Sequence, residues 1–118
     1  MSNEIELRNG EGRWIQWTFR RRNQTTGKLE LLDVSSAIFT FKAKAKLTDD
    51  TYLIEKTDGN FDKTGGANGV VLVNIPASEN TSTLLPPGKY ISEIQAIITV
   101  DTDVIRYESP LIIKESIL

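Results

Sequence analysis

The side chains that most often perform chemistry in proteins are scarce in this sequence. It contains no histidine and no cysteine, which removes the commonest general base, the commonest metal ligand and any thiol nucleophile or disulfide. A serine nucleophile would then depend on a lysine base, but the sequence has no Ser-x-x-Lys pattern. The glycines at 59, 65, 66 and 69 do not have the spacing of a phosphate-binding loop. We therefore expect a protein that is not an enzyme and that uses no cofactor.

One stretch places oxygen-bearing side chains at the spacing of a calcium loop. Asp58, Asn60 and Asp62 alternate as the first three ligands of such a loop would. Lys63 stands where the turn glycine belongs, and Gly69 stands where a bidentate glutamate should complete the coordination shell. We therefore interpret the stretch as a solvated loop and expect no metal.

The one basic run is formed by Arg20, Arg21 and Arg22. Arginines interleaved with aromatic residues can bind nucleic acids or anionic glycans. This run, however, belongs to a chain with 14 basic and 16 acidic residues and a net charge of −2, which favours no polyanionic partner. We expect no nucleic acid partner, and we interpret the run as a solvated strand end or as an ion-pairing surface for another subunit.

The two tryptophans, Trp14 and Trp17, are an odd number of residues apart and so cannot lie on the same face of a strand. We assign Trp17 to the core with Ile15 and Phe19, and we expect Trp14 to point outward. An outward tryptophan is enriched at protein interfaces and also stacks on sugar rings. It can equally lie over a neighbouring strand of its own chain, so these alternatives stay open.

The C-terminal end of the sequence carries apolar residues that have no obvious place in a core. They are Ile112, Ile117 and Leu118. Apolar residues left outside the core often mark a contact with another protein. We predict that the last strand or tail docks on another subunit, together with Trp14 and the arginine run.

The elements that must position these residues are strands. Alternating apolar and polar residues predict about eight of them, at 4–8, 13–20, 29–34, 37–47, 51–57, 70–75, 90–100 and 104–113. The clearest alternation places Ala37, Phe39, Phe41, Ala43, Ala45 and Leu47 inward. Pro110 is predicted to lie at a bulge or on an edge, and one helical turn capped by Ser78 is predicted near residue 78.

These short strands, separated by turn residues, indicate one all-β domain over residues 1–118, an antiparallel β-sandwich. The first residues have neither the basic nor the apolar region of a signal peptide. No apolar run is long enough to cross a bilayer. We expect a soluble protein that is made in a cytoplasm and has no membrane partner.

Three motifs connect the sequence to a known family. They are Asn-Gly-Glu-Gly-Arg at 9–13, Asp-Val-Ser-Ser-Ala at 33–37, and Leu-Pro-Pro-Gly-Lys-Tyr at 85–90 before a long strand. In this order they resemble the N-terminal immunoglobulin-like (Ig-like) domain of phage baseplate upper proteins and related tail and tail-fibre modules. The resemblance implies an Ig-like sandwich and a virion structural protein of the tail or baseplate, present in the bacterial host cytoplasm during assembly. It also implies contacts with neighbouring tail proteins and with copies of itself, with a trimer favoured.

Two other functions remain open. A carbohydrate- or receptor-binding sandwich would use an exposed aromatic platform formed by Trp14 and Tyr52. An Ig-like module of a larger bacterial surface protein is the third hypothesis, because Ig-like sandwiches perform many functions.

Overall fold

The computed structural model describes residues 4–46, 51–98 and 103–117, and these residues form strands and three single-turn 3-10 helices. The strands are β1 (Ile5–Arg8), β2 (Arg13–Thr18), β3 (Arg20–Arg22), β4 (Leu29–Leu31), β5 (Ile38–Lys44), β6 (Ile54–Thr57), β7 (Phe61–Asp62), β8 (Val70–Ile75), β9 (Gly88–Ile98) and β10 (Asp103–Lys114). The 3-10 helices are η1 (Asp58–Asn60), η2 (Gly66–Asn68) and η3 (Ala77–Glu79). The predicted all-β class is confirmed.

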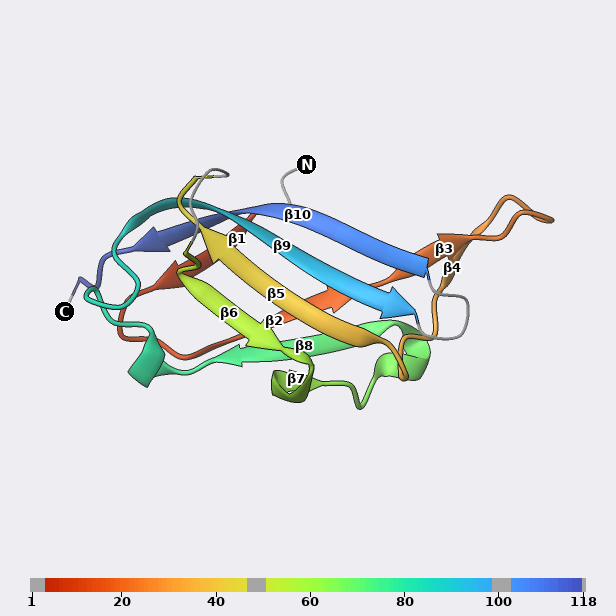
Figure 1. Cartoon of the computed structure of the whole chain (residues 1–118), viewed down its shortest axis with the longest axis horizontal. Coiled ribbons are helices and arrows are strands. Elements are labelled where there is room, and N and C mark those ends of the chain that lie inside the picture. The colour runs from red at the N-terminus through yellow and green to blue at the C-terminus, as the bar shows by residue number, and fades with distance from the viewer. Residues whose placement is uncertain (1–3, 47–50, 99–102, 118) are drawn as a thin grey trace.

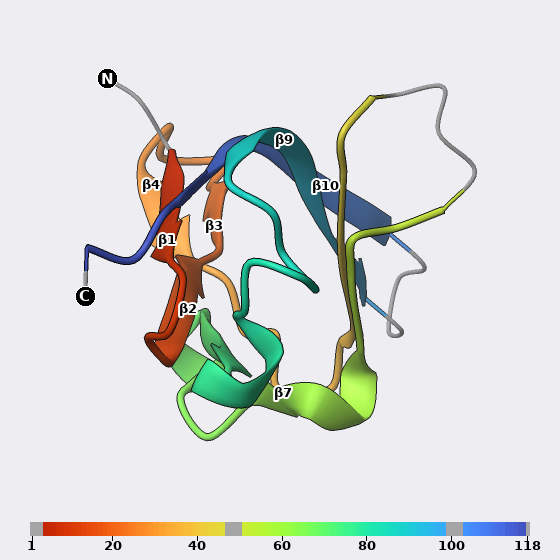
Figure 2. The ribbon, with the colours of Figure 1, turned by 90° about the vertical axis from the view of Figure 1, so that its left-hand side faces the viewer.

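The strands form two layers and a separate hairpin (Figures 1 and 2). One sheet has the order β1-β10-β9-β5-β6, and the other has the order β2-β8-β7. In immunoglobulin nomenclature β10, β9, β5 and β6 take the places of strands G, F, C and C′, while β2, β8 and β7 take those of B, E and D. The predicted Ig-like sandwich is therefore confirmed, and the β3–β4 hairpin is inserted between its B and C strands.

One strand pair departs from the predicted antiparallel arrangement. β1 runs parallel to β10, with Ile5 opposite Leu111 and Arg8 opposite Lys114. The other strand pairs of the described residues are antiparallel. Alternation of side chains has the same period in both kinds of pair, so the sequence pattern cannot reveal the direction of a neighbouring strand.

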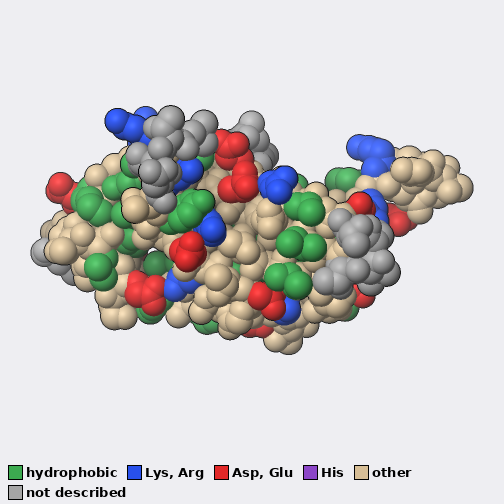
Figure 3. Space-filling view, viewed as in Figure 1, with side chains coloured by type: hydrophobic (Ala, Val, Ile, Leu, Met, Phe, Trp, Pro, Cys, Tyr) green, Lys and Arg blue, Asp and Glu red, His purple; other side chains and the backbone are tan. Residues whose placement is uncertain are grey.

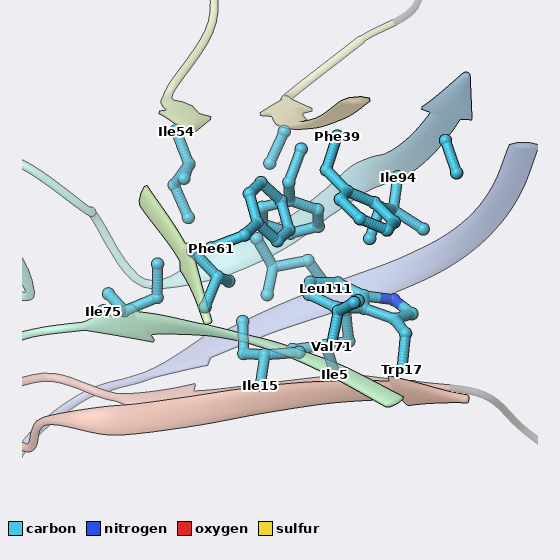
Figure 4. Packing of buried hydrophobic residues seen from close by; sticks show 14 of the residues in the cluster. Ile5, Ile15, Trp17, Phe39, Ile54, Phe61, Val71, Ile75, Ile94 and Leu111 are labelled. Atoms are coloured by element: carbon cyan, nitrogen blue, oxygen red, sulfur yellow. The ribbon is translucent and has the colours of Figure 1, made fainter. Parts of the chain in front are cut away.

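The core lies between the two sheets, and aromatic rings fill its centre (Figure 4). The Trp17 ring lies 5.0 Å from that of Phe41 and 6.2 Å from that of Phe61, between ring centroids. Phe39 stacks on Phe61 at 5.3 Å. The inward assignment of Ile15, Trp17 and Phe19 is confirmed, since all three are buried.

Three local predictions were wrong. Ala45 is exposed because β5 ends at Lys44 and the alternation has no partner strand beyond that point. The strand predicted from residue 51 begins only at Ile54. The helical turn starts after Pro76, whose extended backbone (φ −69°, ψ 156°) makes it the N-cap instead of Ser78. Leu47, which was also predicted to point inward, lies outside the described residues.

Pro110 lies inside β10 without interrupting its register, since it stands opposite Ile91 of β9. Pairing with β1 begins one residue later, at Leu111. The described part of β10 before Leu111 therefore has a strand neighbour on one side only. A proline whose missing N–H points to the unpaired side costs the sheet no hydrogen bond. This is the reason for which Pro110 was predicted to lie at a bulge or on an edge.

Candidate functional site

The arginine run forms one strand of the β3–β4 hairpin, which projects at one end of the molecule (Figure 1). All residues of both strands are exposed. Arg21 Nη2 contacts Asp103 Oδ2 at 2.9 Å and ties the hairpin to the start of β10. Arg22 Nη1 donates a hydrogen bond of 2.6 Å to the backbone carbonyl of Gly27 within the hairpin turn. Two of the three arginines thus hold the hairpin in place.

The register of the hairpin gives it two different faces. Arg20 stands opposite Leu31 and Arg22 opposite Leu29, so these four residues share one face. Arg21 shares the other face with its partner and points toward β10. Leu29 is 57% exposed and Leu31 is 51% exposed. The face that points away from β10 therefore presents two leucines flanked by two arginines.

Trp14 points outward as predicted and is 55% exposed. It lines an open groove of about 540 Å³ between β2 and the β1–β10 edge. Gln16 and Thr18 continue the β2 wall, and Tyr107 and Ser109 come from β10. An exposed tryptophan above a polar groove can serve as a contact for another protein.

The predicted C-terminal contact residues lie far from the arginine run. Ile112 is half-buried on β10, Ile117 is 86% exposed, and Leu118 lies outside the described residues. The end of β10 and the hairpin lie at opposite ends of the long axis (Figure 1). The structure thus does not bring the predicted interface residues together into one surface.

The calcium-like stretch uses its oxygens inside the fold. Asp58 accepts hydrogen bonds from the backbone N–H of Phe39 (3.0 Å) and from Lys63 Nζ (3.1 Å). Asn60 Oδ1 accepts from the backbone N–H of Thr57, and Asp62 Oδ1 from that of Thr64. The three side chains stabilise turns. Within the described residues, no group of three or more acidic, histidine or cysteine side chains could hold a metal ion.

The outer face of the large sheet is a shallow depression of about 450 Å³ lined by polar side chains and Tyr52. Lys42 Nζ lies 4.4 Å from the centroid of the Tyr52 ring, so a cation covers one ring face. Trp14 lines a different groove, which means that the two aromatic residues do not form the joint platform considered for carbohydrate binding.

The same face carries an apolar row that sequence reasoning missed. Ile38, Ile97 and Val104 stand opposite one another across β5, β9 and β10. Ile38 and Val104 are each 46% exposed. Figure 3 shows hydrophobic side chains gathered where these three strands approach the hairpin. Because successive side chains of a strand point to opposite faces, Ile38 points away from the core when its neighbour Phe39 is buried. This alternation is the sequence signal by which Ile38 could have been predicted to be exposed.

A small apolar hollow of about 200 Å³ lies at the end opposite the hairpin. Its lining residues come from the start of β6, the end of β8, η3 and the turn before β9: Leu53, Ile54, Ile75, Glu79, Leu84 and Leu85. Leu84 is 56% exposed at its rim, and Glu79 pairs with Lys56 at 2.6 Å. Leu84 and the two hairpin leucines were not predicted as contact residues. Their exposure depends on how the loops are arranged in the folded chain, which the sequence pattern does not show.

Three exposed carboxylates have lowered pKa values through local donors. A hydrogen bond from Lys114 lowers the pKa of Glu6, and the Ser35 hydroxyl and amide lower that of Asp33. Thr64 does the same for Asp62. Each donor favours the ionised form, which is the behaviour of structural turn and ion-pair residues.

Comparison with known proteins leaves the family open. No family model matches the chain, and no curated protein matches it. A solved structure described as "Tim-2" is similar at 10% sequence identity and a TM-score of 0.41, covering 100% of this chain and 96% of the other. A likeness at this level carries no argument about function.

The class that the fold itself defines is an Ig-like β-sandwich with a hairpin inserted between its B and C strands. Among the described residues, no helix is long and apolar enough to cross a membrane.

Proposed function

We propose that this chain is a non-enzymatic structural module of a phage or prophage tail or baseplate, which acts through self-assembly and contacts with neighbouring tail proteins. The observation that carries the proposal is the set of large apolar side chains left in solvent on projecting or edge positions. They are Trp14, Leu29, Leu31, Ile38, Tyr52, Leu84, Val104 and Ile117. Exposed apolar clusters rimmed by charged residues are typical of protein contact surfaces.

The family resemblance supports the same proposal from the sequence side. It rests on the motifs at 9–13, 33–37 and 85–90. In the fold the first of these is a turn between β1 and β2, and the last leads into β9. Such turns determine how the strands of the sandwich are connected. They therefore support the Ig-like fold more strongly than they support a function in a phage tail.

The proposed partners are copies of the chain and adjacent tail or baseplate proteins, in the virion and in the host cytoplasm during assembly. The number of copies, with a trimer favoured, comes from the family analogy. The groove beside Trp14 is the surface that we assign to a neighbouring protein of different sequence, since an exposed tryptophan is a common interface anchor.

Size-exclusion chromatography with light scattering, across a concentration series, tests the self-assembly. A defined oligomer whose population grows with concentration is expected. A monomer at every concentration would contradict the self-assembly part of the proposal. Genes for capsid or tail proteins beside the gene for this chain would support the tail assignment, and a cell-surface operon would count against it.

A carbohydrate- or receptor-binding function is the alternative, and the polar depression beside Tyr52 is the observation that favours it. Thr40, Gln95 and Arg106 line this depression and offer hydrogen-bonding groups of the kind that sugars use. A glycan array and titration with host-surface sugars, monitored by ligand-observed NMR, test the idea. Saturable binding that is lost in Tyr52→Ala would favour this function over assembly.

A further inference from the structure

The β3–β4 hairpin has the composition of an arm that binds something outside its own domain. An isolated two-stranded hairpin is marginally stable in water, and every residue of both strands here is exposed. Leu29 and Leu31 lie side by side on one face with Arg20 and Arg22. Among the described residues, the ion pair that ties the arm to the body is that of Arg21 with Asp103, on the opposite face. The leucine face is therefore left available for a partner.

The charge of the arm is opposite to that of the rest of the molecule. Residues 20–31 contain four basic residues and one acidic residue, a formal charge of +3. Because the whole chain has a net charge of −2, the remaining residues carry −5. A second copy of the chain thus offers the arm an oppositely charged body, which favours encounter between copies.

The hollow at the other end of the molecule matches the arm in chemistry. Its lining is apolar except for Glu79, whose side chain is 49% exposed. Its volume of about 200 Å³ lies below the roughly 300–1,000 Å³ of small-molecule pockets, and suits a side chain better than a free ligand. Leu84 at the rim adds exposed apolar surface. A leucine can fill such a hollow while a neighbouring arginine approaches Glu79.

The two surfaces lie at opposite ends of a molecule that measures 51 × 30 × 27 Å (Figure 1). The segments that line the hollow lie at the end of the molecule that faces the viewer in Figure 2, and the hairpin projects at the other end, as Figure 1 shows. Where two different surfaces of a chain meet in a single contact they join copies head to tail, whereas a two-fold pair would need both contacts to form at once between the same two copies.

We propose that the chain self-associates head to tail, with the Leu29–Leu31 face of one hairpin seated in the apolar hollow beside Leu84 of the next copy. Arg20 approaches Glu79, whose carboxylate also pairs with Lys56. Repetition of this contact closes a ring if the rotation between copies permits, and otherwise extends a filament. This inference rests on the proposed self-assembly and names the surfaces and the mode.

The test uses two variants that each damage one end of the chain. Leu29→Thr with Leu31→Thr removes the apolar face of the hairpin while keeping strand-favouring residues. Leu84→Arg fills the rim of the hollow and repels the hairpin arginines. Each variant is expected to weaken self-association at least about tenfold in light scattering, as loss of a central apolar anchor does. Unchanged urea midpoints would show that both variants fold, since all three residues are exposed.

Mixing the two variants distinguishes a contact between hairpin and hollow from a contact of either surface with its own copy. Each variant keeps one intact end, so an equimolar mixture is expected to form a species of twice the monomer mass that does not grow with concentration. Ala67→Ser serves as the control and should associate as the unaltered chain does, because Ala67 is exposed and does not line the hollow or belong to the hairpin.

Each outcome bears on a different proposal. Self-association that persists in both variants, or that fails to return on mixing, overturns the head-to-tail inference and leaves the proposed assembly function standing. An unaltered chain that is monomeric at every concentration overturns both the head-to-tail inference and the self-assembly part of the proposed function. Weaker association at high salt and in Arg20→Glu is expected as well, because charges at the rim of an interface are screened.

Discussion

At the scale of single residues, the polar side chains that matter most hold loops together at one end of the sandwich. Asn80 is fully buried, and its amide donates to the carbonyls of Arg8 (2.7 Å) and Glu11 (3.0 Å) while its oxygen accepts from Asn9 (3.1 Å). It thus joins the turn after β1 to the turn after η3. A buried polar group that satisfies several partners is costly to remove, because the partners stay behind without water.

Asn80→Ala is therefore expected to lower the free energy of unfolding by about 2–4 kcal/mol, since it removes three hydrogen bonds from a fully buried side chain. Urea denaturation measures the change. Gln24→Ala, in the exposed hairpin turn, is the matched control and should stay within about 0.5 kcal/mol. An equal effect of both substitutions would show that the buried network contributes little.

Tyr90 connects the sequence motif at 85–90 to the fold. Its hydroxyl donates a 2.5 Å hydrogen bond to the carbonyl of Pro86, four residues upstream, at the entry to β9. This is the tyrosine corner of Ig-like sandwiches. Ser92, two residues on, occupies the place of the second cysteine of antibody domains, and its hydroxyl donates to the Ser109 carbonyl at 2.7 Å.

Tyr90→Phe should cost about 1 kcal/mol, because it removes one hydrogen bond and keeps the ring in place. Thermal unfolding followed by circular dichroism measures the shift in Tm. Tyr52→Phe is the control, since the Tyr52 ring contacts Lys42 through its face and not through its hydroxyl. A Tyr90→Phe variant as stable as the unaltered chain would mean that packing of the ring alone forms the corner.

At the scale of elements, the break between β2 and β3 decides where the hairpin leaves the sandwich. Phe19 N donates to the carbonyl of Gly69 (2.8 Å), and the Phe19 carbonyl accepts from Leu32 N (3.0 Å). Gly69 has φ +81°, and a Cβ added there would lie 2.4 Å from the Phe19 oxygen. The backbones approach so closely that only glycine fits.

Gly69→Ala is expected to destabilise the fold by more than about 3 kcal/mol, because it combines a left-handed backbone with a clash against main chain. Gly27→Ala tests the backbone contribution separately. Gly27 has φ +74° with nothing within 4 Å of an added Cβ, so we expect a cost of only about 1 kcal/mol. Equal costs in urea denaturation would argue against the clash at Gly69.

At the scale of the whole molecule, the free energy of unfolding should change more when the pH is lowered than when it is raised. The folded-state pKa values of Glu6, Asp33 and Asp62 lie below the ordinary values of 4.5 for glutamate and 3.8 for aspartate. Lowered values in the folded state stabilise it above the unfolded pKa, and this stabilisation is lost as the pH falls through the folded pKa. With no histidine, the side chains give no comparable transition near neutrality.

We expect the free energy of unfolding to be nearly constant from about pH 8 to 5 and to fall below about pH 4. Urea titrations at fixed pH values measure this profile. Asp33→Asn with Asp62→Asn should flatten the acid limb, because two of the linked carboxylates are gone. An acid limb that stays as steep in this double variant would assign the effect to other groups.

The sequence by itself determined the all-β class and most of the strands with their buried faces, but β3 and β7 were not predicted. Alternation in 37–44 and 90–98 predicted the central strands of the large sheet, because burial on one face leaves a period of two in the chain. Turn residues predicted where strands end. The absence of histidine and cysteine limited the catalytic and metal-binding side chains that the chain can use.

Tertiary structure alone decided which surfaces the exposed residues share. The parallel pairing of β1 with β10, the projection of the β3–β4 hairpin and the hollow beside Leu84 all join segments far apart in the chain. The alternation of apolar and polar residues indicates only whether a side chain faces inward. It does not indicate which strand is the neighbour in the sheet, or at which end of the molecule a loop lies. The arginine run and the end of β10, which both carry residues proposed from the sequence as contacts, therefore lie at opposite ends of the molecule.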